Sequence, residues 1–150
     1  MNPRYALHPD TALSVLLVED DPGDVPIARE ALAAGRLSTD LHVVTDGVDA
    51  LSYLRRTDEF SEAIRPDLIL LDLNLPRKSG HEVLAEVKQD PDLRRIPVVV
   101  LTTSQAPEDI AKSYDLHASA HVSKPADFDE FTEVVRQIDD FFGNVAELPE

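Results

Sequence analysis

Five short apolar runs are spaced along the chain, and they are separated by stretches in which apolar residues recur with helical spacing. Three of the runs are almost continuous in Val, Ile and Leu, which is typical of parallel strands covered on both faces. Repeated alternation of strand and helix favours a doubly wound α/β sheet with helices on both sides. The runs are Ser14–Val18, Leu41–Val44, Leu68–Leu71, Val98–Leu101 and Ala120–Ser123.

Local signals refine the helices between these runs. Pro26 lacks a backbone donor, so we expect the first helix to start late or to kink. Residues 107–116 predict a weaker helix, and the connection Thr57–Asp67 is expected to be a loop with a short turn. Asp127 is a capping signal for the last helix, and Gly143 is expected to end it.

The length of the chain, 150 residues, is that of one domain. We expect this domain to span residues 13–143, with flexible ends at residues 1–12 and 144–150. No internal repeat or second domain is evident.

Composition excludes several function classes. The net charge of −15 repels phosphate backbones, so we expect no nucleic-acid partner. The absence of cysteine excludes disulfides and thiolate metal sites. No apolar run approaches the ~20 residues of a membrane span, and the first residues do not read as a secretory signal. We therefore expect no membrane association and a cytoplasmic location.

Polar side chains follow four of the five runs, where the carboxyl ends of parallel strands meet at one edge of a sheet. Taken singly, an Asp after a strand is usually a turn former, and a Thr there reflects strand propensity. Their combination is different, because two carboxylates ~5 Å apart repel by about 3 kcal/mol at an effective dielectric of ~20. Oxygen ligands of this kind suit Mg²⁺, or Mn²⁺ in its place. The residues are Glu19, Asp20 and Asp21, Asp72, Thr102 and Thr103, and Lys124 with Pro125.

Four motifs at these positions resemble the signatures of bacterial two-component response regulator receivers. They are VEDD at 18–21, LILLDLNLP at 68–76, VVLTTS at 99–104 and VSKP at 122–125. The resemblance covers about residues 13–142 and implies a flavodoxin-like fold, with a five-stranded parallel sheet in the order 2-1-3-4-5 and five flanking helices. Residues 57–67, residues 72–84 and the absence of an output domain most resemble single-domain regulators paired with bacterial phytochromes.

The resemblance implies a role for each position of the motifs. Asp72 is expected to accept a phosphoryl group from a phosphohistidine on a sensor histidine kinase, with Mg²⁺ as the required cofactor. Asp20 is expected to bind the metal directly together with Asp72, Glu19 through water, and Asn74 through its backbone carbonyl.

The remaining motif positions are expected to contact the phosphoryl group. The resemblance implies that the Thr102 hydroxyl, the Thr103 amide and the Lys124 ammonium do so, and that the Lys124–Pro125 bond is cis. Asp21 falls outside the acidic pair and is expected to cap the first helix.

One position departs from the family pattern. The family commonly carries Tyr or Phe three residues before the lysine, where this chain has His121. We expect Thr102 and His121 to form the conformational switch, with His121 adding pH sensitivity; the alternative is a histidine that is simply packed.

A homodimer is expected through the fourth helix, the fifth strand and the fifth helix, as is common in receivers of this kind. Near the end of the last helix, Phe141 and Phe142 point about 100° apart, so one ring is expected to be exposed unless the chain ends cover it.

Three alternatives remain open. A phosphate carrier or sink in a relay would use the same site as a signalling receiver. A phosphatase with an Asp nucleophile would need an acid two residues after Asp72, where the chain has Asn74. A phosphorylation-independent receiver would typically lack the acceptor, the metal carboxylates or the lysine. We therefore expect a phosphoacceptor signalling protein with self-catalysed phosphotransfer and slow autodephosphorylation, and not an enzyme in the usual sense.

Overall fold

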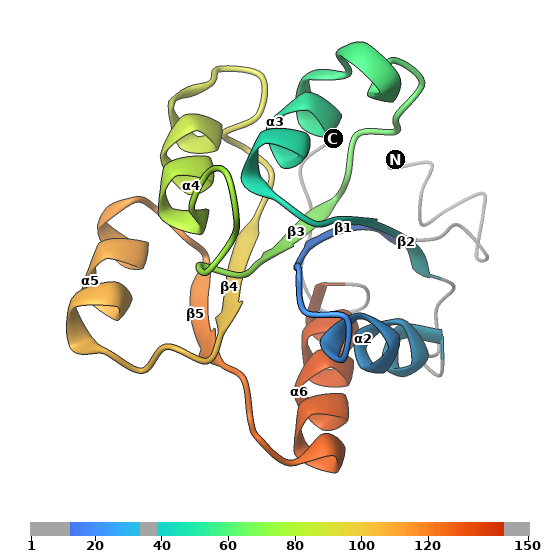
Figure 1. Ribbon diagram of the computed structural model, residues 1–150, viewed down its shortest axis with the longest axis vertical. Coiled ribbons are helices and arrows are strands. Elements are labelled where there is room, and N and C mark those ends of the chain that lie inside the picture. Colours follow the sequence, from blue (N-terminus) through green and yellow to red (C-terminus); the bar gives the residue numbers. More distant parts are fainter. Residues whose placement is uncertain (1–12, 34–38, 143–150) are drawn as a thin grey trace.

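The computed structural model describes residues 13–33 and 39–142, which form one parallel sheet with helices on both faces (Figure 1). The five strands are β1 (Leu13–Val18), β2 (Thr39–Val44), β3 (Leu68–Leu71), β4 (Val98–Thr102) and β5 (Ala120–Ser123). The helices are α2 (Asp24–Ala33), α3 (Gly47–Arg55), α4 (Gly80–Gln89), α5 (Pro107–Asp115) and α6 (Phe128–Asp140), with a 3₁₀ turn at Asp58–Phe60.

The strand order is β2-β1-β3-β4-β5, and every neighbouring pair is parallel. This confirms the doubly wound fold and its five helices. The register brings the carboxyl ends of the central strands level, because Val18 pairs with both Val44 and Leu71, and Leu71 pairs with Val100. The residues that follow these strands therefore emerge at one edge.

The sheet separates two apolar cores. Helices α2 and α6 cover one face, and α3, α4 and α5 lie on the other (Figure 1). Side chains alternate between the cores along β1, with Leu16 and Val18 in one and Val15 and Leu17 in the other. A strand that is buried on both faces explains the almost continuous apolar run in the sequence.

Several local predictions are confirmed. Helix α2 begins only at Asp24, two residues before Pro26, so the start is late as expected. Asp127 caps α6 by accepting from the amides of Asp129 and Glu130. The ring of Phe141 is half exposed. Gly143 and both expected flexible ends lie outside the described residues.

One expectation is wrong for this structure. Within residues 13–33 and 39–142 no peptide bond is cis, so Lys124–Pro125 is trans. The trans isomer is also the intrinsically favoured form of an X–Pro bond.

None of the described helices has the length and apolar character that a bilayer crossing requires.

Candidate functional site

Three carboxylates meet at the carboxyl edge of the sheet. Glu19 and Asp20 follow β1, and Asp72 follows β3, whose end lies beside that of β1. One carboxylate oxygen of each lies within 4.8 Å of the others. Glu19 is only 2% exposed and Asp72 8% exposed, whereas Asp20 faces solvent. The amides of Glu19 and Asp72 bond to the strand carbonyls of Val44 and Val18, so the sheet itself holds this cluster in place.

The donor set of this cluster fits a hard divalent cation. All three side chains supply oxygen, the ligand type that Mg²⁺ and Mn²⁺ prefer, and one of them is open to water. Magnesium usually keeps several waters and binds through one or two carboxylates, which the exposed side of Asp20 permits.

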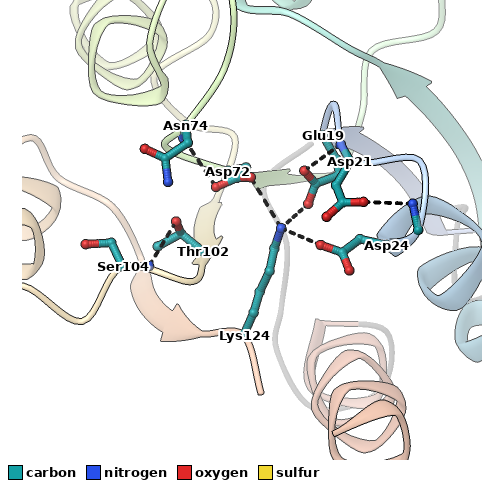
Figure 2. Close-up of polar contacts among 9 residues, drawn as sticks. Glu19, Asp21, Asp24, Asp72, Asn74, Thr102, Ser104 and Lys124 are labelled. Carbon is teal, nitrogen blue, oxygen red and sulfur yellow. Dashed lines mark hydrogen bonds and ion pairs between the residues drawn. The ribbon is translucent and has the colours of Figure 1, made fainter. Parts of the chain in front are cut away.

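Lys124 compensates part of the buried negative charge. Its ammonium donates to Glu19, to Asp24 Oδ2 at 2.9 Å and to Asp72 Oδ2 at 3.3 Å (Figure 2). Burial alone lowers the pKa of Lys124, but the hydrogen bonds to Glu19 and Asp24 and the charge of Asp72 raise it above its ordinary value. Lys124 is therefore protonated at neutral pH.

Burial also acts on the acidic side of this contact. The pKa of Glu19 is raised to about 7, and burial is the largest cause. The Asp72 carboxylate also raises this pKa, whereas Lys124 lowers it. One ammonium thus offsets only part of the charge of the carboxylates around it.

The hydroxyl side of the site comes from the end of β4. Thr102 is fully buried, and its Oγ1 accepts from the Ser104 amide at 3.4 Å (Figure 2). The next residue, Thr103, is exposed. The Lys124 amide donates to the Thr102 carbonyl at 2.7 Å, which joins the ends of β4 and β5.

Asn74 contacts the site through its backbone amide, which donates to Asp72 Oδ1 at 3.3 Å (Figure 2). Its side chain is exposed.

His121 lies half-buried on β5 and bonds to the loop that follows β4. Its Nε2 is 3.2 Å from the Ser104 carbonyl, and its Nδ1 is 3.0 Å from Ser113 Oγ. The structure thus brings the acidic residues, Asn74, Thr102 and Lys124 to one edge and links His121 to that edge through Ser104.

Asp24 is a member of the site that sequence reasoning missed. It is the first residue of α2, and it reaches Lys124 because the helix starts late. Pro26 signals that late start, but nothing in the sequence shows that the side chain turns toward the lysine. The neighbouring Asp21 has a local role, since its Oδ1 accepts from the Gly23 amide at 2.8 Å.

Comparison with known proteins agrees with this geometry. Residues 15–136 match the response regulator receiver domain. The chain is 43% identical to the response regulator Rcp1 of Synechocystis sp. strain PCC 6803, over 90% of this chain and 92% of the relative.

Two solved structures share the whole fold. The phosphorylated cyanobacterial phytochrome response regulator RcpA has a TM-score of 0.90 at 47% identity, covering 93% of this chain and 99% of that one. The Mn²⁺-bound form of Rcp1 has a TM-score of 0.88 at 42% identity, covering 91% and 99%. Fold, edge geometry and sequence agree that this chain belongs to the response regulator receiver family.

Proposed function

We propose that this receiver accepts a phosphoryl group on Asp72 from a phosphohistidine of a partner sensor histidine kinase, in a reaction that requires Mg²⁺. The observation that carries the proposal is the meeting of Glu19, Asp20 and Asp72 with Lys124 at the end of β3. Three carboxylates cluster around one buried ammonium, so negative charge remains that a divalent cation would neutralise. Hydrophobic packing gives no reason for these charged groups to lie together.

In the proposed transfer, a carboxylate oxygen of Asp72 attacks phosphorus and forms an acyl phosphate. The bond from phosphorus to the kinase imidazole nitrogen breaks, and its electron pair stays on that nitrogen. Such a transfer depends mainly on alignment and charge neutralisation. A bound divalent cation would supply charge neutralisation here. Asp20 and Asp72 would hold it directly and Glu19 through water, and the family pattern would add the Asn74 backbone carbonyl.

The other polar groups act on the transferred phosphoryl group, which brings a charge of about −1.5 to −2. The Lys124 ammonium pairs with one phosphoryl oxygen, in exchange for part of its contact with Asp72. The Thr102 hydroxyl and the Thr103 amide donate to the other oxygens. Movement of the loop after β4 then changes the outer surface, on which a downstream partner reads the signal.

We further propose that the partner kinase is a bacteriophytochrome, which would place this protein in light signalling in the cytoplasm. The support is the likeness to RcpA, which is a phytochrome response regulator, and to Rcp1.

A homodimer through α5, β5 and α6 completes the proposal. Its support is the exposed Tyr114 on α5, with 51% of its surface accessible, and the half-exposed Phe141 directly after α6. Sedimentation of the wild type and of a Tyr114→Glu variant tests it. A dimer that the variant weakens supports this face, and a monomeric wild type contradicts it.

The direct test of phosphoryl acceptance uses a small phosphodonor, with and without Mg²⁺, followed by intact mass measurement. The wild type should gain about 80 Da with the metal present. Asp72→Asn should gain nothing, since the amide is not a nucleophile for phosphorus. An adduct that forms equally well on Asp72→Asn would contradict the assignment.

A further inference from the structure

The ammonium of Lys124 lies between carboxylates that come from different elements. Asp24 Oδ2 accepts from it at 2.9 Å and Asp72 Oδ2 at 3.3 Å, and Glu19 is the third acceptor. Figure 2 shows Asp72 on one side of the ammonium and Glu19 and Asp24 on the other. The lysine side chain is only 4% exposed, so these carboxylates largely determine where the ammonium points.

Neither cation binding nor charge compensation accounts for Asp24. Among the residues that the structure describes, the carboxylates that gather for a cation are Glu19, Asp20 and Asp72. Two of these already contact Lys124, so its charge is compensated without Asp24. A further carboxylate also adds repulsion in a site that is to take up a phosphoryl group with a charge of about −1.5 to −2. What Asp24 gives Lys124 is therefore a direction rather than a missing charge.

The three contacts of the ammonium differ in length. An ammonium has three hydrogens to donate, so three acceptors use all of them and fix its orientation. Charge-assisted N–H···O bonds are usually about 2.7–2.9 Å long, and the contact with Asp24 falls in this range whereas that with Asp72 is longer. The contact with Asp72 is thus the one most easily exchanged for a phosphoryl oxygen, while Asp24 and Glu19 keep the other two hydrogens.

Local hydrogen bonds place Asp24 relative to Glu19. The Asp21 amide donates to Glu19 Oε2 at 3.2 Å, and the Asp24 amide donates to the Asp21 carbonyl at 3.2 Å. Asp24 is also the first residue of α2, whose inner face is buried against the sheet. The backbone therefore holds Asp24 in place, and Asp24 can hold the lysine.

We propose that Asp24 is a positioning residue for phosphoryl acceptance, which holds the Lys124 ammonium toward Asp72 so that it meets the incoming phosphoryl group. This inference rests on the proposed function and assigns Asp24 no contact with the phosphoryl group or the cation. Asp24 acts by accepting a hydrogen bond. An amide oxygen at this position should therefore serve in part, and an apolar side chain should not.

The first experiment measures the rate at which a small phosphodonor forms the adduct at saturating Mg²⁺ in Asp24→Ala and Asp24→Asn. Both variants lose the same charge, and only Asp24→Asn keeps an oxygen that accepts from Lys124. Asp24→Ala should be slower than Asp24→Asn by about three- to thirtyfold, within the effect of one lost hydrogen bond. Equal rates in these two variants would overturn the inference.

Asp21→Asn is the matched control for charge. It removes a carboxylate from the same turn, makes no contact with the lysine, and keeps the oxygen that accepts from the Gly23 amide. It should form the adduct at nearly the wild-type rate. A loss in Asp21→Asn as large as that in Asp24→Ala would show that charge near the site, and not the contact with Lys124, determines the rate, and would contradict the inference.

The second experiment follows the Lys124 ammonium by NMR in the unphosphorylated protein without Mg²⁺. A buried ammonium that donates to three acceptors exchanges its hydrogens slowly with water, and its signal is assigned by its loss in Lys124→Ala. Asp24→Ala should speed this exchange by about tenfold, the effect of one lost hydrogen bond, and Asp24→Asn should speed it less. Asp21→Asn should leave it unchanged. The backbone amide signals of the same samples show that each variant is folded.

Two results of the NMR experiment would also overturn the inference. One is an exchange rate that Asp24→Ala leaves unchanged, and the other is a wild type without a slowly exchanging ammonium. If the wild type accepts no phosphoryl group at all, the proposed function fails, and the exchange rate still decides whether Asp24 holds Lys124.

Discussion

At the scale of single residues, Lys124 is the buried cation that compensates the carboxylates at the edge of the sheet. Its ammonium contacts Glu19, Asp24 and Asp72, and its side chain is almost entirely buried. Leaving a buried charge without its partner costs much more folding free energy than a surface ion pair contributes. The stability of this edge therefore depends on the lysine whenever no cation is bound.

Replacing the lysine tests this dependence. Lys124→Ala should lower the free energy of unfolding without Mg²⁺ by about 3–5 kcal/mol, because buried carboxylates are left without compensation. Added Mg²⁺ should stabilise the variant more than the wild type, since the cation then supplies the missing charge. Urea denaturation with and without Mg²⁺ measures both effects, with the exposed Lys112→Ala as the control. Equal stabilities of Lys124→Ala and the wild type would contradict this account.

Sequence reasoning could identify most of the residues at this edge, for a physical reason. Strand ends that share an edge bring Glu19, Asp20, Asp72 and Thr102 together whatever the details of packing. The assignment of individual roles came from the family resemblance. Ser113 could not be found this way. It is a single serine in the weak helix α5, and nothing in the sequence indicates that His81 of α4 and His121 of β5 contact its hydroxyl.

At the scale of elements, the start of α4 is packed directly against the end of β3. A Cβ built on Gly80 would lie 2.3 Å from the Asp72 carbonyl oxygen and 2.6 Å from Leu73 Cα. The Gly80 amide donates to the Leu73 carbonyl at 2.9 Å. Glycine is thus required here for close approach, and that approach fixes the backbone that carries Asp72.

Gly80→Ala should force α4 away from β3 and displace Asp72. Overpacking of this kind costs about 1–3 kcal/mol of stability, and we expect slower formation of the phosphoryl adduct as well. Urea denaturation and the rate of adduct formation check both effects. Gly23→Ala is a matched control, since its Cβ would meet only the Asp21 side chain at 3.2 Å. An unchanged adduct rate in Gly80→Ala would show that the packing does not position Asp72.

The sequence predicted which strands and helices form, but it predicted their first and last residues less well. Apolar runs predicted all five strands, but β2 begins two residues earlier than its run, at Thr39 and Asp40. These polar residues lie on β2, which is the outer strand among the five that the structure describes, so the apolar pattern is weak there. The trans Lys124–Pro125 bond was also missed, since the family pattern implied the other isomer.

At the scale of the whole molecule, one polar contact ties the last helix to the far edge of the sheet. The Thr39 hydroxyl on β2 donates to Asp139 Oδ1 of α6 at 2.9 Å. Asp139 is only 3% exposed. Burial raises the pKa of its carboxyl, Thr39 opposes this effect, and the neighbouring Asp140 adds to it.

The raised pKa makes global stability depend on pH in a defined direction. The folded state holds the Asp139 proton more tightly than the unfolded chain does, so this stabilisation is complete below the ordinary value of 3.8 and is lost as the pH rises through the folded value. Asp139→Asn keeps an oxygen acceptor for Thr39 and removes the charge. The variant should be more stable than the wild type at about pH 7, and the difference should shrink toward about pH 4.

Thermal unfolding at several pH values measures this difference. The exposed neighbour Asp140→Asn should give a much smaller gain. A loss of stability in Asp139→Asn at neutral pH would show that the carboxylate charge itself is needed.

The strand order of the sheet was predicted from the family resemblance, since alternation of strands and helices alone allows other orders. Once that order is known, the rest of the architecture follows from the sequence. The two apolar cores, the helices that cover them and the acidic edge all agree with the apolar runs and with the polar residues that end them.

The most direct test of the central claim locates the phosphoryl group on the chain. Borohydride reduces an acyl phosphate of aspartate to homoserine, which peptide mass spectrometry can place at a single position. After incubation with a phosphodonor and Mg²⁺, the account predicts homoserine at position 72 and unmodified Glu19, Asp20 and Asp24. Reduction at one of those three acids, with Asp72 intact, would contradict it.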